Sequence, residues 1–339
     1  MKHDYKVLIV GSGSIGLRHQ DVLKQHFPNA KAVFLTRKRK PKIDEDIYKN
    51  LENINDAKRF DPEIVVVANP SPWHLQSAKE WIGSCQAILI EKPLSRNLTE
   101  CLDFYKETKK LNVPILVGYN LRFLSSLNEF KKLFGEGITG KTYSIRVEVG
   151  QYLPNWRPGT DYSQSVSAQA ELGGGALLEL SHEIDYLRWI FGDFNWVFGI
   201  MERSGSLDID VEDMVQVLFS IKTQQYGHVV GSFQLDFLRQ DRSRKCEVIG
   251  ELGTLHWDGI AGSVDFYPKN GLAWENKFQE KSGRNESYLQ EWIHLFDCMR
   301  TGNMPSPGLV DGIRVLEVVE AIRESSSKGI KLPITKVQL

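Results

Sequence analysis

The sequence predicts an α/β protein with an N-terminal doubly wound parallel sheet and a C-terminal α+β domain built on a mostly antiparallel sheet. The chain opens with a buried strand, a glycine-rich turn and an amphipathic helix, and apolar strands then alternate with helices to about residue 120. A further strand is expected at residues 141–149. Strands at 214–221 and 226–235, and at 245–250 and 253–257, follow each other closely without helices between them, which predicts two antiparallel hairpins. We expect domains at residues 1–120 and 121–339, with the alternative that the C-terminal helix packs back on the first domain.

The first strand leads into glycines at the spacing G-x-G-x-x-G, which are Gly11, Gly13 and Gly16. Gly11 permits the tight turn into the helix, Gly13 lets the backbone approach a pyrophosphate, and Gly16 lets the helix pack close to the strand. The N-terminal N–H groups and the dipole of the helix then face an anion. The pattern predicts a dinucleotide site to which Ser14 and Ile15 also contribute. A purely structural glycine turn is the alternative.

The second strand ends at Thr36, twenty residues after Gly16. Sites that prefer NAD carry an Asp or Glu near this position, which holds the ribose 2′-hydroxyl. Here the acid is missing and four cations, Arg37 to Lys40, follow instead. Cationic side chains suit a 2′-phosphate, so the sequence favours NADP(H), with Thr36 and Arg37 as contacts and NAD as the alternative cofactor. A solvated basic turn is the competing explanation of the four cations.

Two later loops carry polar residues where buried strands end. Asn69 and His74 lie in one loop, and Glu91 and Lys92 follow the next strand. Because ligands of doubly wound sheets bind outside the carboxyl ends of the strands, we expect these residues to line the cofactor crevice near the nicotinamide. There the Lys92 ammonium would hydrogen-bond a reacting oxygen and lower its pKa. The alternative is a surface lysine before a turn-forming proline.

The glycine motif, the Asn69–His74 loop and Glu91-Lys92-Pro93 together resemble the glucose–fructose oxidoreductase / inositol dehydrogenase (Gfo/Idh/MocA) family. The segment from Gly173 to Asp185 extends the resemblance into the second half, so that it covers essentially the whole chain. The resemblance implies a Rossmann domain followed by an open, mostly antiparallel sheet. One side of that sheet would carry the substrate pocket and the other commonly an oligomer interface, which implies a homodimer or homotetramer.

His182 lies near the start of an amphipathic helix after three consecutive glycines. An imidazole exchanges protons near neutral pH, and the resemblance makes His182 the leading proton carrier. A helix cap or a core histidine is the alternative. In the family an aspartate usually precedes this histidine by four residues and orients it, whereas here Glu179 precedes it by three. Either Glu179 reaches the imidazole, or Asp185, three residues after it on the same helical face, takes that role.

An aromatic and charged loop rich in proline and glycine runs from Gln151 to Tyr162. Aromatic rings stack on sugar faces, and arginine binds hydroxyls and phosphates. The substrate candidates are therefore Tyr152, Trp156, Arg157 and Tyr162. A loop that packs its aromatics on the sheet is the alternative. Two further basic positions stay open: Arg122 would face the cofactor crevice or lie on a surface helix, and the segment Arg239–Arg244 would be a solvated turn or would hold a neighbouring subunit or a nucleotide diphosphate.

Composition argues against several classes of protein. The 42 Lys and Arg balance 43 Asp and Glu, so no basic field favours nucleic acid. No apolar run is long enough for a membrane span, and the first strand begins without a signal segment, so we expect a cytoplasmic protein. The four cysteines lie far apart without a CxxC pair, and we expect neither a metal site nor a disulfide framework.

These features predict an NAD(P)-dependent oxidoreductase that transfers a hydride between nicotinamide and a carbinol or carbonyl carbon of a sugar, sugar derivative or polyol. Lys92 would polarise the oxygen and His182 would relay the proton. One alternative is a nucleotide-sugar dehydrogenase or reductase in surface-glycan biosynthesis. Another is a non-catalytic regulator of the same fold that senses the dinucleotide. The presence of both Lys92 and His182 favours an enzyme.

Overall fold

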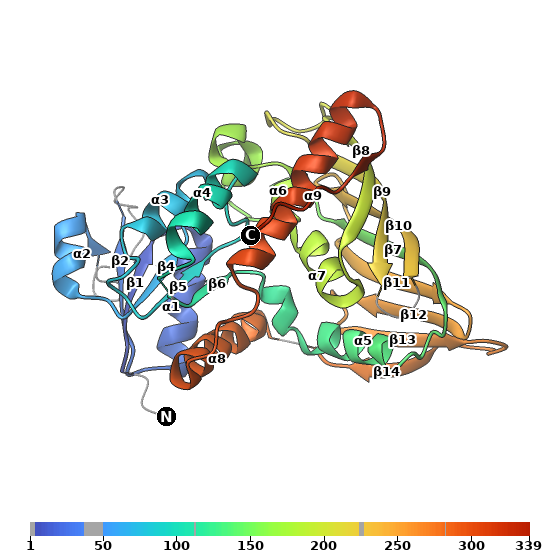
Figure 1. Cartoon of the computed structure of the whole chain (residues 1–339), viewed down its shortest axis with the longest axis horizontal. Coiled ribbons are helices and arrows are strands. Elements are labelled where there is room, and N and C mark those ends of the chain that lie inside the picture. The colour runs from blue at the N-terminus through green and yellow to red at the C-terminus, as the bar shows by residue number, and fades with distance from the viewer. Residues whose placement is uncertain (1–3, 37–49, 112, 224–226, 282) are drawn as a thin grey trace. The chain divides into compact units, whose positions relative to one another are not determined.

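The computed structural model describes residues 4–36, 50–111, 113–223, 227–281 and 283–339, which form two compact units (Figure 1). The first unit is built on Met1–Asn120 and Arg284–Ile313, and the second on Leu121–Gly283 and Arg314–Gln338. The segment 284–313, which the sequence-based division assigns to the second domain, thus folds with the first unit. Helix α9 (Leu309–Lys328) runs from the first unit into the second.

The first unit contains a six-stranded sheet in the order β3-β2-β1-β4-β5-β6, in which every neighbouring pair is parallel. Every residue of β4 and β5 is buried, as expected of central strands covered on both faces. The order reverses between β1 and β4, and ligands of doubly wound sheets bind at such a point. The predicted parallel sheet is confirmed. Its strands are β1 Lys6–Val10, β2 Lys31–Leu35, β3 Asn50–Leu51, β4 Ile64–Val67, β5 Ala87–Ile90 and β6 Ile115–Val117.

Helices cover both faces of this sheet, with α3 and α4 together on one face and α1 beside α8 on the other (Figure 1). Asn53 and Asn97 cap α2 and α4, because each side chain accepts a hydrogen bond from a backbone N–H in the first turn. The helices of the first unit are α1 Ser14–His26, α2 Ile54–Phe60, α3 His74–Lys79, α4 Leu98–Thr108 and α8 Glu286–Thr301, and the 3₁₀ turn η1 Ser71–Trp73 precedes α3.

The second unit contains a nine-stranded sheet in the order β14-β13-β12-β11-β7-β10-β9-β8-β15. The predicted hairpins β9–β10 and β11–β12 are confirmed. One pair, β7 with β10, is parallel, because strands separated by a long crossover need not run in opposite directions. The strands are β7 Thr142–Gly150, β8 Phe194–Glu202, β9 Met214–Thr223, β10 Gly227–Asp236, β11 Ser243–Gly250, β12 Gly253–Asp258, β13 Ser263–Pro268, β14 Glu275–Gln279 and β15 Leu332–Pro333.

Helices pack on one face of this second sheet. Helix α5 contacts β12 and β13, while α6 and α7 contact β9. The opposite face carries the exposed apolar side chains of Ile200, Leu218 and Val230 on three adjacent strands. Within the described ranges no helix has the length and apolar character of a membrane span. The helices of this unit are α5 Ser125–Gly135, α6 Ala176–Glu179, α7 His182–Phe191 and most of α9. Its 3₁₀ turns are η3 Leu153–Asn155, η4 Tyr162–Gln164, η5 Val166–Ala168 and η6 Ala170–Leu172. The 3₁₀ turn η2 Asn120–Phe123 contains the point at which the chain passes from the first unit to the second.

Candidate cofactor and active site

The glycine turn between β1 and α1 is too tight for side chains at two of its positions. Gly11 has a φ of +106°, and a Cβ added to it would lie 2.7 Å from the backbone nitrogen of Asn69. A Cβ on Gly16 would lie 2.1 Å from the carbonyl oxygen of Gly11. Both positions therefore require glycine because of backbone conformation and helix–strand packing.

Gly13 is different, since a Cβ built on it would meet no atom within 4 Å. Gly13 is the N-cap of α1, no side chain caps the helix there, and its first turn, which begins with Ser14 and Ile15, has no acidic residue. Space is therefore open beside Gly13, at the end of α1 where the first N–H groups and the positive end of the helix dipole lie. The protein itself does not require glycine at this position, but a bound molecule in the open space would. A dinucleotide pyrophosphate suits the positive end of the helix because it is an anion.

The loop after β4 holds two of the predicted cofactor residues. Asn69 donates from Nδ2 to Ser77 Oγ at 2.8 Å, and its buried Oδ1 accepts no hydrogen bond from any described residue. A buried, unused acceptor beside the glycine turn suits a ribose hydroxyl or a carboxamide N–H of a nicotinamide cofactor.

His74 is buried and connects this loop to the next one. Its Nδ1 lies 2.9 Å from the carbonyl oxygen of Pro93, and its Nε2 lies 2.6 Å from that of Asn69. Burial lowers the pKa of the His74 imidazole, while the two carbonyl oxygens and the nearby Glu91 oppose that shift. His74 thus connects the loops that follow β4 and β5, at the carboxyl ends of these two strands.

The second strand ends as predicted, without an acid. Thr36 follows β2 directly, and its hydroxyl lies 3.4 Å from that of Ser12 in the glycine turn. Arg37 and the rest of the basic run lie outside the described residues.

Glu91 and Lys92 follow β5 at its carboxyl end. Glu91 is buried: its Oε1 is 2.8 Å from His19 Nε2, and its Oε2 accepts the backbone N–H of Lys92 at 3.1 Å. Lys92 is half-buried and precedes the cis-proline Pro93. The side chain of Glu91 therefore fixes the backbone from which the Lys92 ammonium extends. Sequence reasoning missed His19, although it stands three residues after the last glycine of the motif.

In the second unit, His182 is the first residue of α7 and Glu179 the last of α6. Asp185, the other candidate to orient His182, forms a buried bidentate pair with Arg122: Nε donates to Oδ2 at 2.8 Å and an NH2 group to Oδ1 at 2.6 Å. Arg122 is thus buried rather than on a surface helix.

The charged segment from Arg239 to Arg244 is held by ion pairs at both ends. Arg239 pairs with Glu148 and with Asp241. Arg244 Nε lies 2.8 Å from a carboxylate oxygen of Glu183, whose side chain is fully buried. The ends of this segment are therefore tied to the fold and are not a freely solvated turn.

The substrate candidates lie on the loop after β7. Trp156 donates its indole N–H to the carbonyl of Gln151 at 3.0 Å and meets Phe237 edge-on at 5.1 Å between ring centroids. The Tyr162 hydroxyl accepts the backbone N–H of Asp208 at 3.1 Å. Trp156 and Tyr162 thus have the contacts of a packed loop, while Tyr152 and Arg157 are half-buried beside them.

Two family models match this chain. Residues 5–119 match a model described as an oxidoreductase family with an NAD-binding Rossmann fold, and residues 127–256 match the GFO/IDH/MocA C-terminal domain. The chain belongs to the Gfo/Idh/MocA oxidoreductase family. The resemblance read from the glycine motif and Glu91-Lys92-Pro93 is thereby confirmed.

Curated relatives of this Gfo/Idh/MocA protein include sugar and polyol dehydrogenases. The myo-inositol 2-dehydrogenase of Thermotoga maritima is 24% identical and covers 96% of this chain and 98% of its own length. The levoglucosan dehydrogenase of Pseudarthrobacter phenanthrenivorans is 25% identical over 79% of each chain. An uncharacterized oxidoreductase of a Synechocystis strain is 32% identical, over 48% of this chain and 44% of that protein.

Solved structures share the fold of this Gfo/Idh/MocA chain. A levoglucosan dehydrogenase in complex with NADH matches with a TM-score of 0.84 over 98% of this chain and all of that chain, at 20% identity. The WlbA dehydrogenase of Bordetella pertussis, in complex with NADH and UDP-GlcNAcA, matches with a TM-score of 0.80 over 98% of each chain, also at 20% identity. At such identities these likenesses establish the fold of both halves.

Proposed function

We propose that this protein is an NAD(P)-dependent oxidoreductase that transfers a hydride between nicotinamide and a carbinol or carbonyl carbon of a sugar, sugar derivative or polyol. The observation that carries the proposal lies in the first unit. An uncapped helix N-terminus faces open space at Gly13, and Lys92 follows the carboxyl end of β5, which is two strands from β1 in the same sheet. Family membership and the sugar and polyol dehydrogenases among the relatives support it.

The residues of this chain have distinct tasks in that reaction. A nicotinamide cofactor, held by the start of α1 and by Asn69, would supply the acceptor for the hydride that the substrate carbon loses. Lys92 donates a hydrogen bond to the substrate oxygen and stabilises the negative charge that develops there. His182 takes the hydroxyl proton as the C=O bond forms, and the reverse direction uses the same groups in the opposite sense. Either Glu179 or Asp185 orients His182 in this proposal, and Asp185 also pairs with Arg122 through both carboxylate oxygens.

The cofactor is NADP(H) in this proposal, with NAD as the alternative. Thr36 offers a hydroxyl and no negative charge where an acid would repel a 2′-phosphate. Replacing Thr36 by aspartate should therefore raise the KM for NADP at least about tenfold while that for NAD changes less, because the carboxylate repels the phosphate. Steady-state kinetics with both cofactors measures this ratio. If Thr36→Asp leaves the ratio of the two KM values unchanged, the 2′-phosphate of NADP does not lie at the end of β2.

A valine at Gly13 should block the cofactor without harming the fold. Its side chain would enter the open space above α1, so the melting temperature should change by no more than about 3 °C. Affinity for NAD(P)H should fall more than about tenfold, because the pyrophosphate needs the same space. Fluorescence titration of NAD(P)H measures this. Gly135→Val, at a glycine with equally open surroundings in α5, is the matched control and should bind normally. Unchanged affinity for NAD(P)H in Gly13→Val would contradict a pyrophosphate site at the start of α1.

The substrate groups proposed for the loop after β7 are Tyr152, Trp156, Arg157 and Tyr162. Aromatic edges and faces with one guanidinium suit a polyhydroxylated ring, with or without a phosphate. A nucleotide sugar is the second candidate substrate. It is supported by Arg157, and a fold neighbour has been solved with UDP-GlcNAcA.

The deciding experiment follows cofactor absorbance with purified protein, both cofactors, and a panel of free sugars, polyols and nucleotide sugars. Turnover of free sugars or polyols supports the proposal as stated. Turnover confined to nucleotide sugars selects the second candidate. Cofactor binding without turnover of any panel member contradicts the enzyme and leaves a dinucleotide-sensing regulator.

A homodimer or homotetramer through the outer face of the second sheet is part of the proposal. Ile200, Leu218 and Val230 are 43%, 52% and 51% exposed on adjacent strands, which is unusual for apolar side chains at the centre of a sheet. Analytical ultracentrifugation should give a mass of two or four chains. A monomer at micromolar concentration would contradict this assembly.

A further inference from the structure

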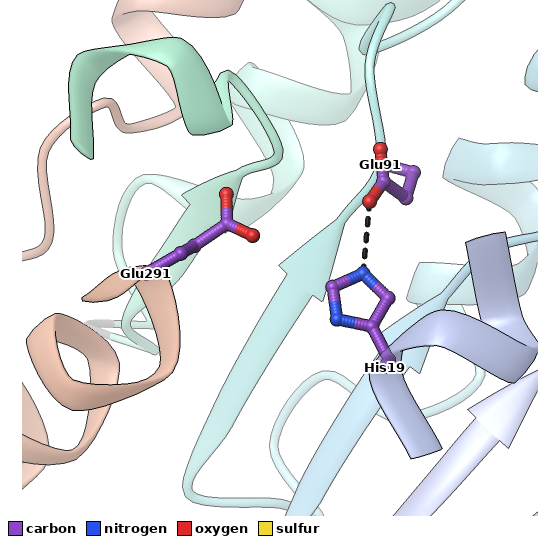
Figure 2. Close-up of side chains that lie close together, drawn as sticks. All are labelled: His19, Glu91 and Glu291. Carbon is purple, nitrogen blue, oxygen red and sulfur yellow. Dashed lines mark hydrogen bonds and ion pairs between the residues drawn. The ribbon is translucent and has the colours of Figure 1, made fainter. Parts of the chain in front are cut away.

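A buried cluster of ionisable groups in the first unit includes Glu91, the residue that directly precedes Lys92 at the end of β5. It consists of His19 on α1, Glu91 after β5 and Glu291 on α8, with one polar atom of each within 4.8 Å of the others (Figure 2). Figure 2 shows the Glu291 carboxylate directed toward the His19–Glu91 pair. Nothing in the proposed reaction uses Glu291, although burying a carboxyl group is costly.

The hydrogen bonds of His19 fix its protonation. The indole Nε1 of Trp292 is a donor only, and it donates to His19 Nδ1 at 3.1 Å. Nδ1 is therefore unprotonated, and the proton of the neutral ring is on Nε2, which donates to Glu91 Oε1 at 2.8 Å. Since Glu91 also accepts the Lys92 backbone N–H, its carboxylate has two donors and holds the negative charge.

Glu291 has the opposite environment. Its side chain is fully buried, and neither carboxylate oxygen has a hydrogen-bond partner among the described residues. Burial, and then the charge of Glu91, raise the pKa of Glu291 well above its ordinary value. The other ionisable groups nearby are the buried Tyr288 hydroxyl and Arg18, whose guanidinium lies over the Tyr288 ring at 5.1 Å. Two adjacent carboxylates cannot both remain charged there, so the proton belongs to Glu291.

The same three groups could be considered as ligands of a divalent cation. His19 argues against that, because one ring nitrogen accepts from Trp292 and the other carries its proton toward Glu91. A cation on Nε2 would displace this proton while the Trp292 N–H blocks protonation of Nδ1, leaving an imidazolate. A proton on Glu291 neutralises the second carboxylate of the cluster and leaves the His19 ring neutral.

We propose that Glu291 is a neutral carboxylic acid that donates to Glu91 through one bridging water molecule and so positions Lys92. The separation is within the span of one bridging water molecule. An ionised Glu291 would repel Glu91, and a displaced Glu91 would release the Lys92 backbone N–H. Glu291 is thus a positioning residue that α8 contributes to the strand end that carries Lys92. The inference rests on the role proposed for Lys92.

The protonation of Glu291 can be tested without any substrate. A carboxyl whose pKa is raised by folding stabilises the protein fully only below the ordinary pKa of glutamate, and this stability is lost as the pH rises toward the raised value. Glu291→Gln has no proton to lose. Its melting temperature relative to wild type should therefore increase steadily from about pH 5 to about pH 8. Asp103→Asn, which removes an exposed carboxylate from α4, is the control and should show no such increase over the same pH range. A pH-independent difference for Glu291→Gln would overturn the neutral acid.

The positioning role is tested by kinetics. Glu291→Gln retains shape and a donor, and should keep kcat within about threefold of wild type, whereas Glu291→Ala should lose roughly ten- to a hundredfold in kcat with little change in the KM for cofactor. Equal losses in both variants, or no loss in Glu291→Ala, would overturn the role. If wild type turns over no substrate, the proposed function fails, and the melting comparison still decides whether Glu291 is neutral.

Discussion

Replacing Lys92 by methionine is expected to lower kcat about 10²- to 10⁴-fold, the usual contribution of a positioned proton-donating group. Methionine keeps much of the length of the side chain and removes the ammonium that stabilises the developing charge on the substrate oxygen. The pyrophosphate site that we propose is at the start of α1, so affinity for NAD(P)H should stay within a few-fold of wild type. Steady-state kinetics and a cofactor titration together measure this separation of kcat from cofactor binding.

Lys106→Met is the matched control for Lys92→Met, because Lys106 is 70% exposed and pairs with Asp103 on the surface of α4. It should leave kcat and stability unchanged. Loss of cofactor affinity in parallel with kcat would make Lys92 a cofactor ligand. Unchanged kcat in Lys92→Met would remove it from the reaction.

Replacing Asp185 by asparagine is expected to destabilise the protein by about 3–5 kcal/mol, as breaking a buried ion pair usually does. The side chains of Asp185 and Arg122 are 2% and 4% exposed, so the variant removes the charge that pairs with a buried guanidinium. Urea unfolding followed by tryptophan fluorescence measures the loss. Asp103→Asn, which breaks the exposed pair with Lys106, should cost no more than about 0.5 kcal/mol.

The same variant separates the two candidate orienting acids. If Asp185→Asn kept normal stability but changed the pH dependence of kcat, Asp185 would act on His182 and the structural role of its pair with Arg122 would be refuted.

Much of the fold could be predicted because its signals are local. The apolar runs of strands β1, β4 and β5 and the glycines after β1 are each visible within about ten residues of sequence. Strands β3, β8, β13, β14 and β15 are not predicted from the sequence, and β8 and β14 show the reason most clearly. Strand β14 is an edge strand with exposed side chains at four of its five positions, and β8 has an irregular burial pattern, so neither shows the alternation that identifies a half-buried strand.

The predicted site was incomplete wherever a side chain depends on a distant partner. His19 and Trp292 are 273 residues apart in sequence, and no periodicity connects them. From the sequence, Glu291 is expected to be an exposed charged residue of an amphipathic helix. The packing of α8 beside α1 instead brings its carboxylate within 4.8 Å of the polar atoms of His19 and Glu91. Arg122 and Asp185 were each assigned other roles because the sequence does not show that they bind each other. Glu91 and Lys92, in contrast, could be predicted from their position at a strand end.

The most direct measurement of the central claim is isotopic. A substrate identified in the panel and deuterated at its reacting carbinol carbon is incubated with wild-type protein and oxidised cofactor, and the reduced cofactor is examined by NMR and mass spectrometry. We expect one deuterium per turnover, on a single face of nicotinamide C4, and greatly reduced transfer with Lys92→Met. Reduced cofactor that carries hydrogen from solvent, or no reduced cofactor with any sugar, polyol or nucleotide sugar, would contradict hydride transfer by this protein.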